Sequence, residues 1–180
     1  MTRPAVLLAA MLLSGCAGML QPATTDNTAA AEVKDATGRT VGTANLTQLG
    51  SAVRIVMQVS GLPPGVKGVH IHEVGKCEGP AFTSAGGHFN PDQREHGALN
   101  PKGSHAGDLP NLTVGGDGTG RLETTTEQIS LGSGPTTLAD ADGSAIVIHA
   151  APDDFRTDPT GNSGARIACG VITKSDGPRR

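Results

Sequence analysis

Eight short segments of the chain carry the apolar or alternating patterns of β-strands, and turns rich in glycine and proline separate them. Turn chemistry of this kind occurs at Thr37-Gly38, at Pro63-Pro64-Gly65 and at Asp117-Gly118. The chain has 26 glycines and 12 prolines, and no stretch is convincing as an amphipathic helix or an internal repeat. We therefore predict an all-β fold, an antiparallel barrel or sandwich. The expected strands lie at residues 31–35, 40–48, 52–60, 66–74, 111–114, 121–126, 144–150 and 166–172.

Two long polar segments, residues 75–110 and 151–165, interrupt this rhythm. A loop of more than about thirty residues without secondary structure of its own is uncommon unless it has a function. Metal coordination would order such a loop without a core. The second segment contains Asp153, Asp154 and Asp158, and we expect the last two to be solvated loop charges.

Histidines are concentrated in one part of the sequence. Five of the six fall between residues 70 and 105, and the sixth, His149, ends the apolar run 145–148. Alternation along a strand places the rings of His70 and His72 on one face, about 6.6 Å apart. Imidazole is the commonest side-chain ligand of first-row transition metals, and a carboxylate such as Asp108 readily completes such a site. The remaining histidines are His88, His96 and His105.

Counting donors extends this hypothesis. Two four-coordinate ions need eight donor positions, whereas six histidines and one aspartate supply seven. One imidazole that binds both ions through its two nitrogens would balance the count, because two neighbouring cations favour loss of its second ring proton. The alternative is that His96 and His105 are surface loop residues and His149 is a hydrogen-bonded core residue.

The first fifteen residues do not belong to the expected fold. Arg3 is followed by an apolar run at residues 5–13, too short to span a bilayer of about 30 Å as a helix. The sequence Leu13-Ser14-Gly15-Cys16 resembles the lipobox of bacterial lipoprotein signal peptides. This resemblance implies a signal peptide at 1–15, a lipid anchor on Cys16, a tether at 16–30 and an exported, envelope or periplasmic protein. The alternative is an ordinary buried cysteine in a core helix.

Two cysteines remain, Cys77 and Cys169, an even pair for an oxidising compartment. A disulfide between them would close a loop of about 90 residues and stabilise the fold by about 4–5 kcal/mol in the chain-entropy model. Two free thiols are the alternative, and the sequence alone leaves the pairing open.

Several motifs together resemble the copper/zinc superoxide dismutase family. They are GVHIHE at 68–73, GHFNP at 87–91, HG at 96–97, HAGDLPN at 105–111 and GARIACGVI at 164–172. The resemblance covers residues 31–173 and implies an eight-stranded antiparallel Greek-key β-barrel with two long functional loops. Residues 174–180 would form a polar tail.

The resemblance also implies a ligand set for each metal. His88 would bridge one copper and one zinc ion per subunit. The copper ligands would be His70, His72, His88 and His149, and the zinc ligands His88, His96, His105 and Asp108. Imidazoles suit a copper ion that changes oxidation state, and a closed set of three histidines and an aspartate suits structural zinc.

Further roles follow from the same resemblance. Cys77–Cys169 matches the disulfide of the family, Arg166 its active-site arginine, and Asp153 a carboxylate that hydrogen-bonds one copper and one zinc histidine. The implied reaction converts superoxide to dioxygen and hydrogen peroxide, with His88 delivering a proton. The alternative is that Arg166 pairs with Asp153 or Asp158 as a surface ion pair.

The composition and the ligand set also bear on other partners and functions. A net charge of -3 shows no basic excess, which argues against nucleic acid. Only three aromatic residues, all phenylalanine, are present, so an aromatic-rich interface is not available and a homodimer or a monomer stays open. A zinc-only structural relative would be expected to lack a copper ligand, and a copper-buffering protein would have no use for Arg166. We therefore expect a lipid-anchored dismutase that protects the envelope.

Overall fold

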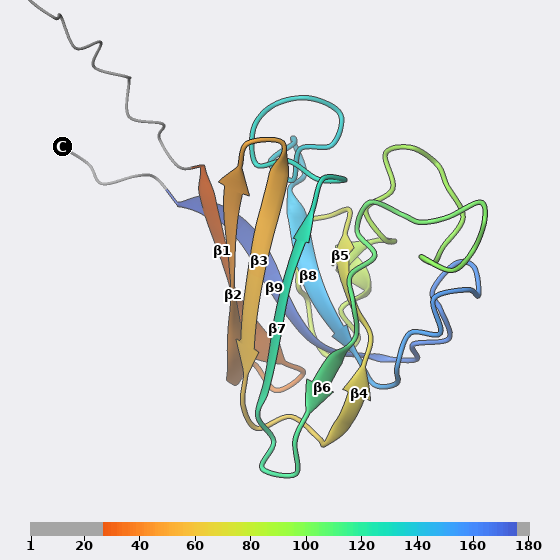
Figure 1. Ribbon diagram of the computed structural model, residues 1–180. Coiled ribbons are helices and arrows are strands. Elements are labelled where there is room, and N and C mark those ends of the chain that lie inside the picture. Colours follow the sequence, from red (N-terminus) through yellow and green to blue (C-terminus); the bar gives the residue numbers. More distant parts are fainter. Residues whose placement is uncertain (1–26, 176–180) are drawn as a thin grey trace, which may run out of the picture.

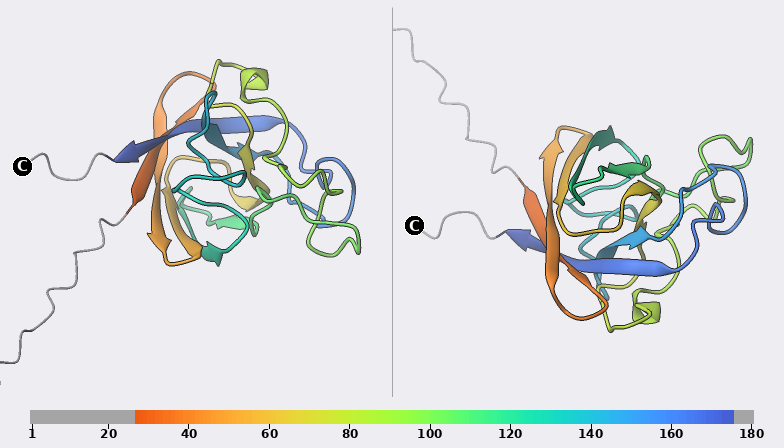
Figure 2. Two further views of the ribbon diagram at one scale, coloured as in Figure 1. Left: turned by 90° about the horizontal axis from the view of Figure 1, so that it is seen from above. Right: turned by 90° about the horizontal axis from the view of Figure 1, so that it is seen from below.

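The computed structural model describes residues 27–175, and within them nine strands form one antiparallel sheet (Figure 1). The sheet curls into a nearly closed barrel, seen end-on in Figure 2. Neighbouring strands follow the order β4-β6-β7-β3-β2-β1-β9-β8-β5. The strands are β1 (Thr28–Asp35), β2 (Thr40–Leu49), β3 (Ala52–Val59), β4 (Gly65–Lys67), β5 (Val69–His72), β6 (Leu112–Val114), β7 (Gly120–Thr126), β8 (Ser144–His149) and β9 (Arg166–Ser175).

The all-β prediction is confirmed, with nine strands in place of the expected eight. The segment expected as one strand at 66–74 divides at Gly68, because β4 pairs with β6 at one edge of the sheet and β5 pairs with β8 at the other. A Cβ atom at Gly68 would lie only 2.8 Å from the Cβ of Ser163, so a glycine fits this crossing point. Because β4 and β5 are the two edge strands and follow one another in the sequence, the chain itself connects the two edges of the sheet.

The first and last strands extend beyond their expected ranges. β1 begins at Thr28, three residues before the expected domain start at 31, and β9 continues to Ser175. The expected signal peptide, Cys16 and most of the tether lie outside the described residues. Among residues 27–175, no helix has the length and hydropathy needed to cross a membrane.

Alternating burial along the strands builds the core. In β3, Val53, Ile55, Met57 and Val59 point inward, and the residues between them are more exposed. Strands β7 and β8 are not neighbours, so their connection crosses from one part of the barrel to another, as in Greek-key folds. Three apolar residues of that connection are buried in the same core as β3, namely Ile129, Leu131 and Leu138.

The two long loops lie together on one side of the barrel (Figures 1 and 2). The first runs from β5 to β6 and contains a single short 3₁₀ helix, η1 (Thr83–Ala85); the second joins β8 to β9. The loops contact one another through their backbones, since Leu99 N–H donates to the Phe155 carbonyl over 2.9 Å. Gly97 packs directly on the same carbonyl, where any side chain would overlap with it.

A disulfide attaches the first loop to the barrel. Cys77 in the loop and Cys169 in β9 are bonded, with their Cα atoms 5.6 Å apart, so the disulfide prediction is confirmed. Cys169 is buried in a small second cluster with Phe82, Ala85 and Val147. This cluster anchors the segment of the first loop around η1, which lies just before His88 in the sequence.

Candidate metal centre

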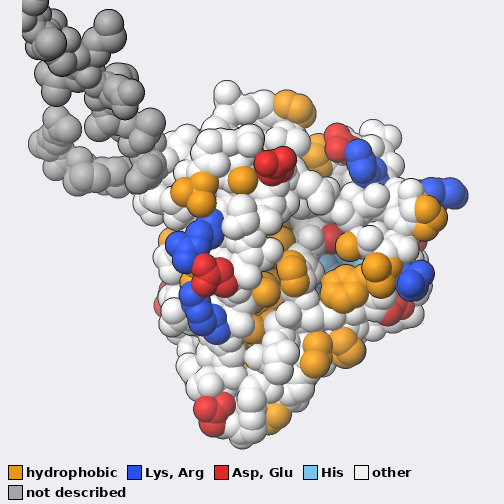
Figure 3. Space-filling view, viewed as in Figure 1, with side chains coloured by type: hydrophobic (Ala, Val, Ile, Leu, Met, Phe, Trp, Pro, Cys, Tyr) orange, Lys and Arg blue, Asp and Glu red, His pale blue; other side chains and the backbone are white. Residues whose placement is uncertain are grey.

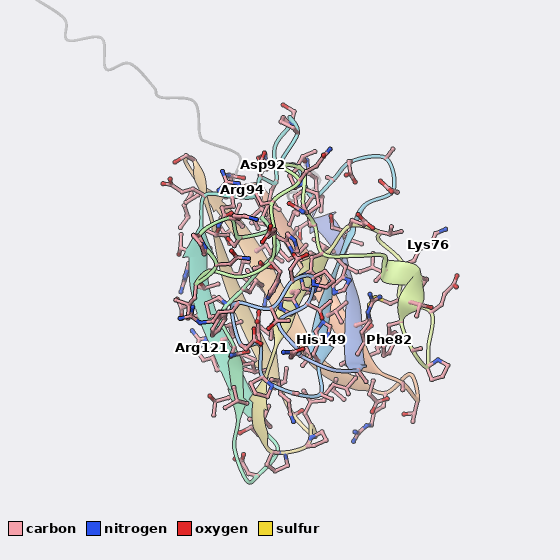
Figure 4. The ribbon with its side chains drawn as sticks, turned by 90° about the vertical axis from the view of Figure 1, so that its right-hand side faces the viewer. Lys76, Phe82, Asp92, Arg94, Arg121 and His149 are labelled. Atoms are coloured by element: carbon pink, nitrogen blue, oxygen red, sulfur yellow. A yellow bond between two sulfur atoms is a disulfide. The ribbon has the colours of Figure 1, made fainter. Side chains whose placement is uncertain are left out.

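Because side chains alternate between the two faces of a strand, the histidines of β5 face the two long loops rather than the barrel core. Val69 and Ile71 belong to the barrel core, whereas His70 and His72 point to the opposite face of the strand. His149 ends the neighbouring strand β8, and its N–H donates to the carbonyl of Gly68. In Figure 4, which views the molecule from the loop side, His149 lies near the centre and Phe82 lies toward η1.

His88 of the first loop joins these three through an isolated β-bridge to His72. One nitrogen of each of the four rings lies within 4.8 Å of those of the others. All four residues are buried, and the space-filling view shows only a small area of histidine between hydrophobic side chains on the loop side (Figure 3). The four residues expected to bind copper are therefore brought together: His70, His72, His88 and His149.

Four nitrogens of this set are buried without a hydrogen-bond partner in the described part of the chain. Leaving a buried polar atom unsatisfied costs about 1–3 kcal/mol, so four in one place call for a common ligand. Electron-pair donation to a cation is what neutral imidazole nitrogens can offer. The four atoms are His70 Nδ1, His72 Nε2, His88 Nε2 and His149 Nε2.

The other nitrogen of three of these rings is held in place. His72 Nδ1–H donates to the Gly86 carbonyl over 3.0 Å, and His149 Nδ1–H donates to the Gly164 carbonyl over 3.1 Å. His70 Nε2–H donates to Asp153 Oδ2 over 2.9 Å. These contacts orient the rings so that their remaining nitrogens face one another, as in preorganised metal sites.

A second donor set adjoins the first and converges on Asp108. The Nδ1 atoms of His88, His96 and His105 lie 3.0, 3.1 and 3.4 Å from Asp108 Oδ1. Two ligands of a tetrahedral zinc ion, each at about 2.0–2.1 Å from it, are about 3.3 Å apart. The spacing and the donor types therefore fit zinc, the metal expected at these residues.

His70 also lies near this second set, because one of its nitrogens is within 4.8 Å of donors on His88, His96 and Asp108. We favour His105 as the fourth member. Its Nδ1 approaches both Asp108 Oδ1 and, at 3.3 Å, His88 Nδ1, whereas His70 Nε2 is committed to Asp153. His88 thus directs Nδ1 toward one set and Nε2 toward the other, which is the arrangement of a bridging ligand.

Two carboxylates organise the centre. Asp108 Oδ2 accepts backbone N–H bonds from Gly97 and His105, each 3.0 Å long, which leaves Oδ1 facing the three imidazoles. Asp153 accepts from His70 through Oδ2 and from His96 through Oδ1, the latter over 3.0 Å. The expected link between one histidine of each set is therefore present.

Burial keeps three of the four histidines expected to bind copper neutral, namely His72, His88 and His149. It lowers the pKa of His72 to about 2, with the neighbouring His88 adding to the effect. It also lowers the pKa of His149 to about 3, helped by His70. For His88, burial lowers the pKa to about 4 although the hydrogen bond to Asp108 opposes it. Neutral rings at pH 7 have a free electron pair, which a metal requires.

The donor set expected to bind zinc (His88, His96, His105 and Asp108), called the zinc set below, is more polar. Burial alone would lower the pKa of His96, but hydrogen bonds to Asp108 and Asp153 outweigh it and raise this pKa to about 9. Burial would raise the pKa of the Asp108 and Asp153 carboxyl groups. Hydrogen bonds from the histidines outweigh burial and hold each of these pKa values well below its usual range. A metal that binds here must therefore displace a proton from His96.

Arg166 opens β9 directly opposite His149. Its Nη1 donates to the Phe82 carbonyl over 2.7 Å and its Nη2 to the Gly86 carbonyl over 2.6 Å. The idea of a surface pair with Asp153 or Asp158 is wrong, because the guanidinium faces the first loop instead. The Gly86 carbonyl also accepts from His72, so one loop residue orients both the cation and a histidine.

Sequence reasoning missed several supporting contacts. Asp158, expected to be solvated, accepts the His96 backbone N–H over 2.6 Å. Asn111 braces Asp153 with two bonds of 2.9 Å, one to its N–H and one to its carbonyl. These bonds join loops that lie 42 or more residues apart in sequence, so no local pattern marks them. Glu73, which directly follows His72, accepts from the N–H of Gly87, next to His88.

Fold and site together define a metal-binding β-barrel with two adjoining donor sets that share one histidine. The sequence model of the family described as copper/zinc superoxide dismutase (SODC) matches residues 40–172. The chain belongs to this family.

Relatives extend over most of the domain. A copper/zinc superoxide dismutase of Aquifex aeolicus is 45% identical over 144 residues, covering 79% of this chain and 85% of the relative. One of Caulobacter vibrioides is 43% identical over 147 residues, covering 80% and 84%. The crystal structure of a superoxide dismutase-like protein from Bacillus subtilis superimposes with a TM-score of 0.76 at 43% identity, covering 79% of this chain and 96% of that one.

Proposed function

We propose that this protein is a copper/zinc superoxide dismutase. The observation that carries the proposal is the set of four buried imidazole nitrogens without partners in residues 27–175, next to a second set that shares His88. Copper would be held by His70, His72, His88 and His149, and zinc by His88, His96, His105 and Asp108. Bound copper would supply one-electron exchange with superoxide, and zinc, which has no redox chemistry, would supply a fixed charge.

The residues around this centre have distinct tasks. Arg166 presents a permanent cation to an anionic substrate, and the carbonyls of Phe82 and Gly86 hold its guanidinium in place. Since the net charge of the chain is -3, attraction must come from this local charge. His88 can hold a proton at Nε2 when that nitrogen is not bound and pass it to the reduced substrate. Asp153 fixes His70 and His96 throughout.

Metal analysis combined with an inhibitor-controlled dismutase assay tests the proposal. We expect about one copper and one zinc per chain, and turnover that cyanide, a copper ligand, abolishes. Zinc without copper after reconstitution would support a structural relative instead. Bound copper without turnover would support a copper-buffering protein. Either result would refute the dismutase assignment.

We also propose export and lipid anchoring. The support is the lipobox-like Leu13-Ser14-Gly15-Cys16 after a short apolar run, in residues outside the described part of the structure. The role would then be protection of the cell envelope from superoxide made outside the cytoplasm. Replacement of Cys16 by Ser should abolish fatty-acid labelling and release the protein from membranes. Labelling that survives this replacement would exclude Cys16 as the anchor.

A further inference from the structure

Four of the six histidines of the centre have a fixed hydrogen-bond acceptor behind the ring, and His105 does not. A metal-binding imidazole usually donates its second N–H to a fixed acceptor, which sets its tautomer and orientation. Such acceptors exist for His70, His72, His96 and His149, and His88 directs both nitrogens into the donor sets. His105 differs, because its Nδ1 faces the zinc set and no described hydrogen bond holds its Nε2.

The group opposite His105 Nε2 is Asp158. Its Oδ1 lies 3.9 Å away, too far for a direct hydrogen bond but within the span of one bridging water. The same oxygen accepts the backbone N–H of His96 over 2.6 Å. One carboxylate oxygen of the second loop therefore lies against two zinc-set histidines of the first loop.

Asp154, in the same loop, provides a contrast. Its carboxylate accepts from the N–H groups of Arg156 and Thr157 over 2.9 and 2.8 Å and from the side chain of Asn162 over 2.9 Å. All its described contacts stay within its own loop. Asp154 thus shapes the loop, whereas Asp158 reaches across to the metal centre.

We propose that Asp158 is a positioning residue for the zinc half of the centre. It holds the backbone at His96 and favours the tautomer of His105 with the proton on Nε2, which leaves Nδ1 free to bind a cation. A carboxylate behind a ligating imidazole also raises its basicity and hence its affinity for the metal. This inference rests on the zinc site of the proposed function.

The test compares Asp158→Ala and Asp158→Asn with the matched control Asp154→Ala. Zinc affinity is measured on metal-free protein by competition with a chelator, and cobalt(II) bound in place of zinc reports ligand geometry through its visible spectrum. Loss of a carboxylate behind a metal ligand typically lowers affinity about 10–100-fold. We expect a loss in that range and altered cobalt bands for Asp158→Ala, with copper affinity within about threefold of wild type. Asp158→Asn, which keeps the shape and one oxygen acceptor, should fall between wild type and Asp158→Ala.

Two results would overturn this inference. One is zinc affinity and cobalt bands in both Asp158 variants that match wild type. The other is an equal loss in Asp154→Ala, which would reduce the role of Asp158 to loop stability. Failure of the wild-type protein itself to bind zinc, or insensitivity of its cobalt spectrum to His105→Ala, would instead refute the zinc site of the proposed function and this inference with it.

Discussion

Removal of the Cys77–Cys169 disulfide should lower the free energy of unfolding of the metal-free protein by about 4.6 kcal/mol. The bond joins residues 92 positions apart, and the chain-entropy model for a loop of this length gives that loss at 25 °C. For a domain of this size, each kcal/mol corresponds to about 2–4 °C in melting temperature, so the melting temperature should fall by about 9–18 °C.

Urea and thermal unfolding of the metal-free Cys77→Ala/Cys169→Ala variant measure this loss. Wild-type protein under a strong reductant is the control, because it breaks the same bond and keeps both sulfur atoms. The difference between the two isolates the effect of truncating the buried Cys169. Agreement between them within about 1.5 kcal/mol is expected for a volume change this small.

A loss below about 2 kcal/mol in both samples would refute the entropic account, since it falls at the low end of what native disulfides contribute.

Removal of the disulfide should also lower the activity of the metal centre. The bond fixes the loop segment whose Phe82 and Gly86 carbonyls hold Arg166. We therefore expect turnover of the metal-loaded variant to fall more steeply than its metal content.

Three further predictions concern the centre itself. Arg166→Glu should slow turnover by about tenfold or more, because local charge can raise association rates by about 10–10³-fold. Atomic absorption should show a nearly unchanged metal content. Unchanged activity would refute the role of Arg166 in attracting the substrate. Asp153→Asn should lower both copper and zinc affinity about 10–100-fold in chelator competition, since it orients one histidine of each set, and a loss confined to one metal would contradict this. The metal-free protein should lose stability as pH falls below 6.5, because His72, His88 and His149 have lowered pKa values and take up protons first in the unfolded chain. Each contributes up to about 1.4 kcal/mol per pH unit, and a melting temperature constant from pH 7 to pH 5 would contradict this.

Much of the fold follows from local patterns in the sequence. Alternation in the segment Val69–His72 separates two core residues from two histidines, and the structure has this separation. The division of the expected strand at Gly68 could not be predicted, because it depends on β4 and β5 pairing with strands at opposite edges of the sheet. A period-2 pattern continues through such a crossing without a break.

The candidate site, like the fold, could be predicted only in part from the sequence. The identities of the donors could be proposed from motifs, and the structure brings all of them together. The groups that orient them could not, since carbonyls such as Gly86 O have no side-chain signature. Asp158 was expected to be a solvated charge, because its partner His96 lies 62 residues away along the chain. Contacts between two irregular loops depend on the packed structure.

Anomalous X-ray scattering at the copper and zinc absorption edges, from crystals of the metal-loaded protein, tests the shared centre most directly. We predict two separate peaks: copper among His70, His72, His88 and His149, and zinc beside Asp108, with His88 in contact with both metals. A single peak, or two peaks that do not share His88, would contradict it.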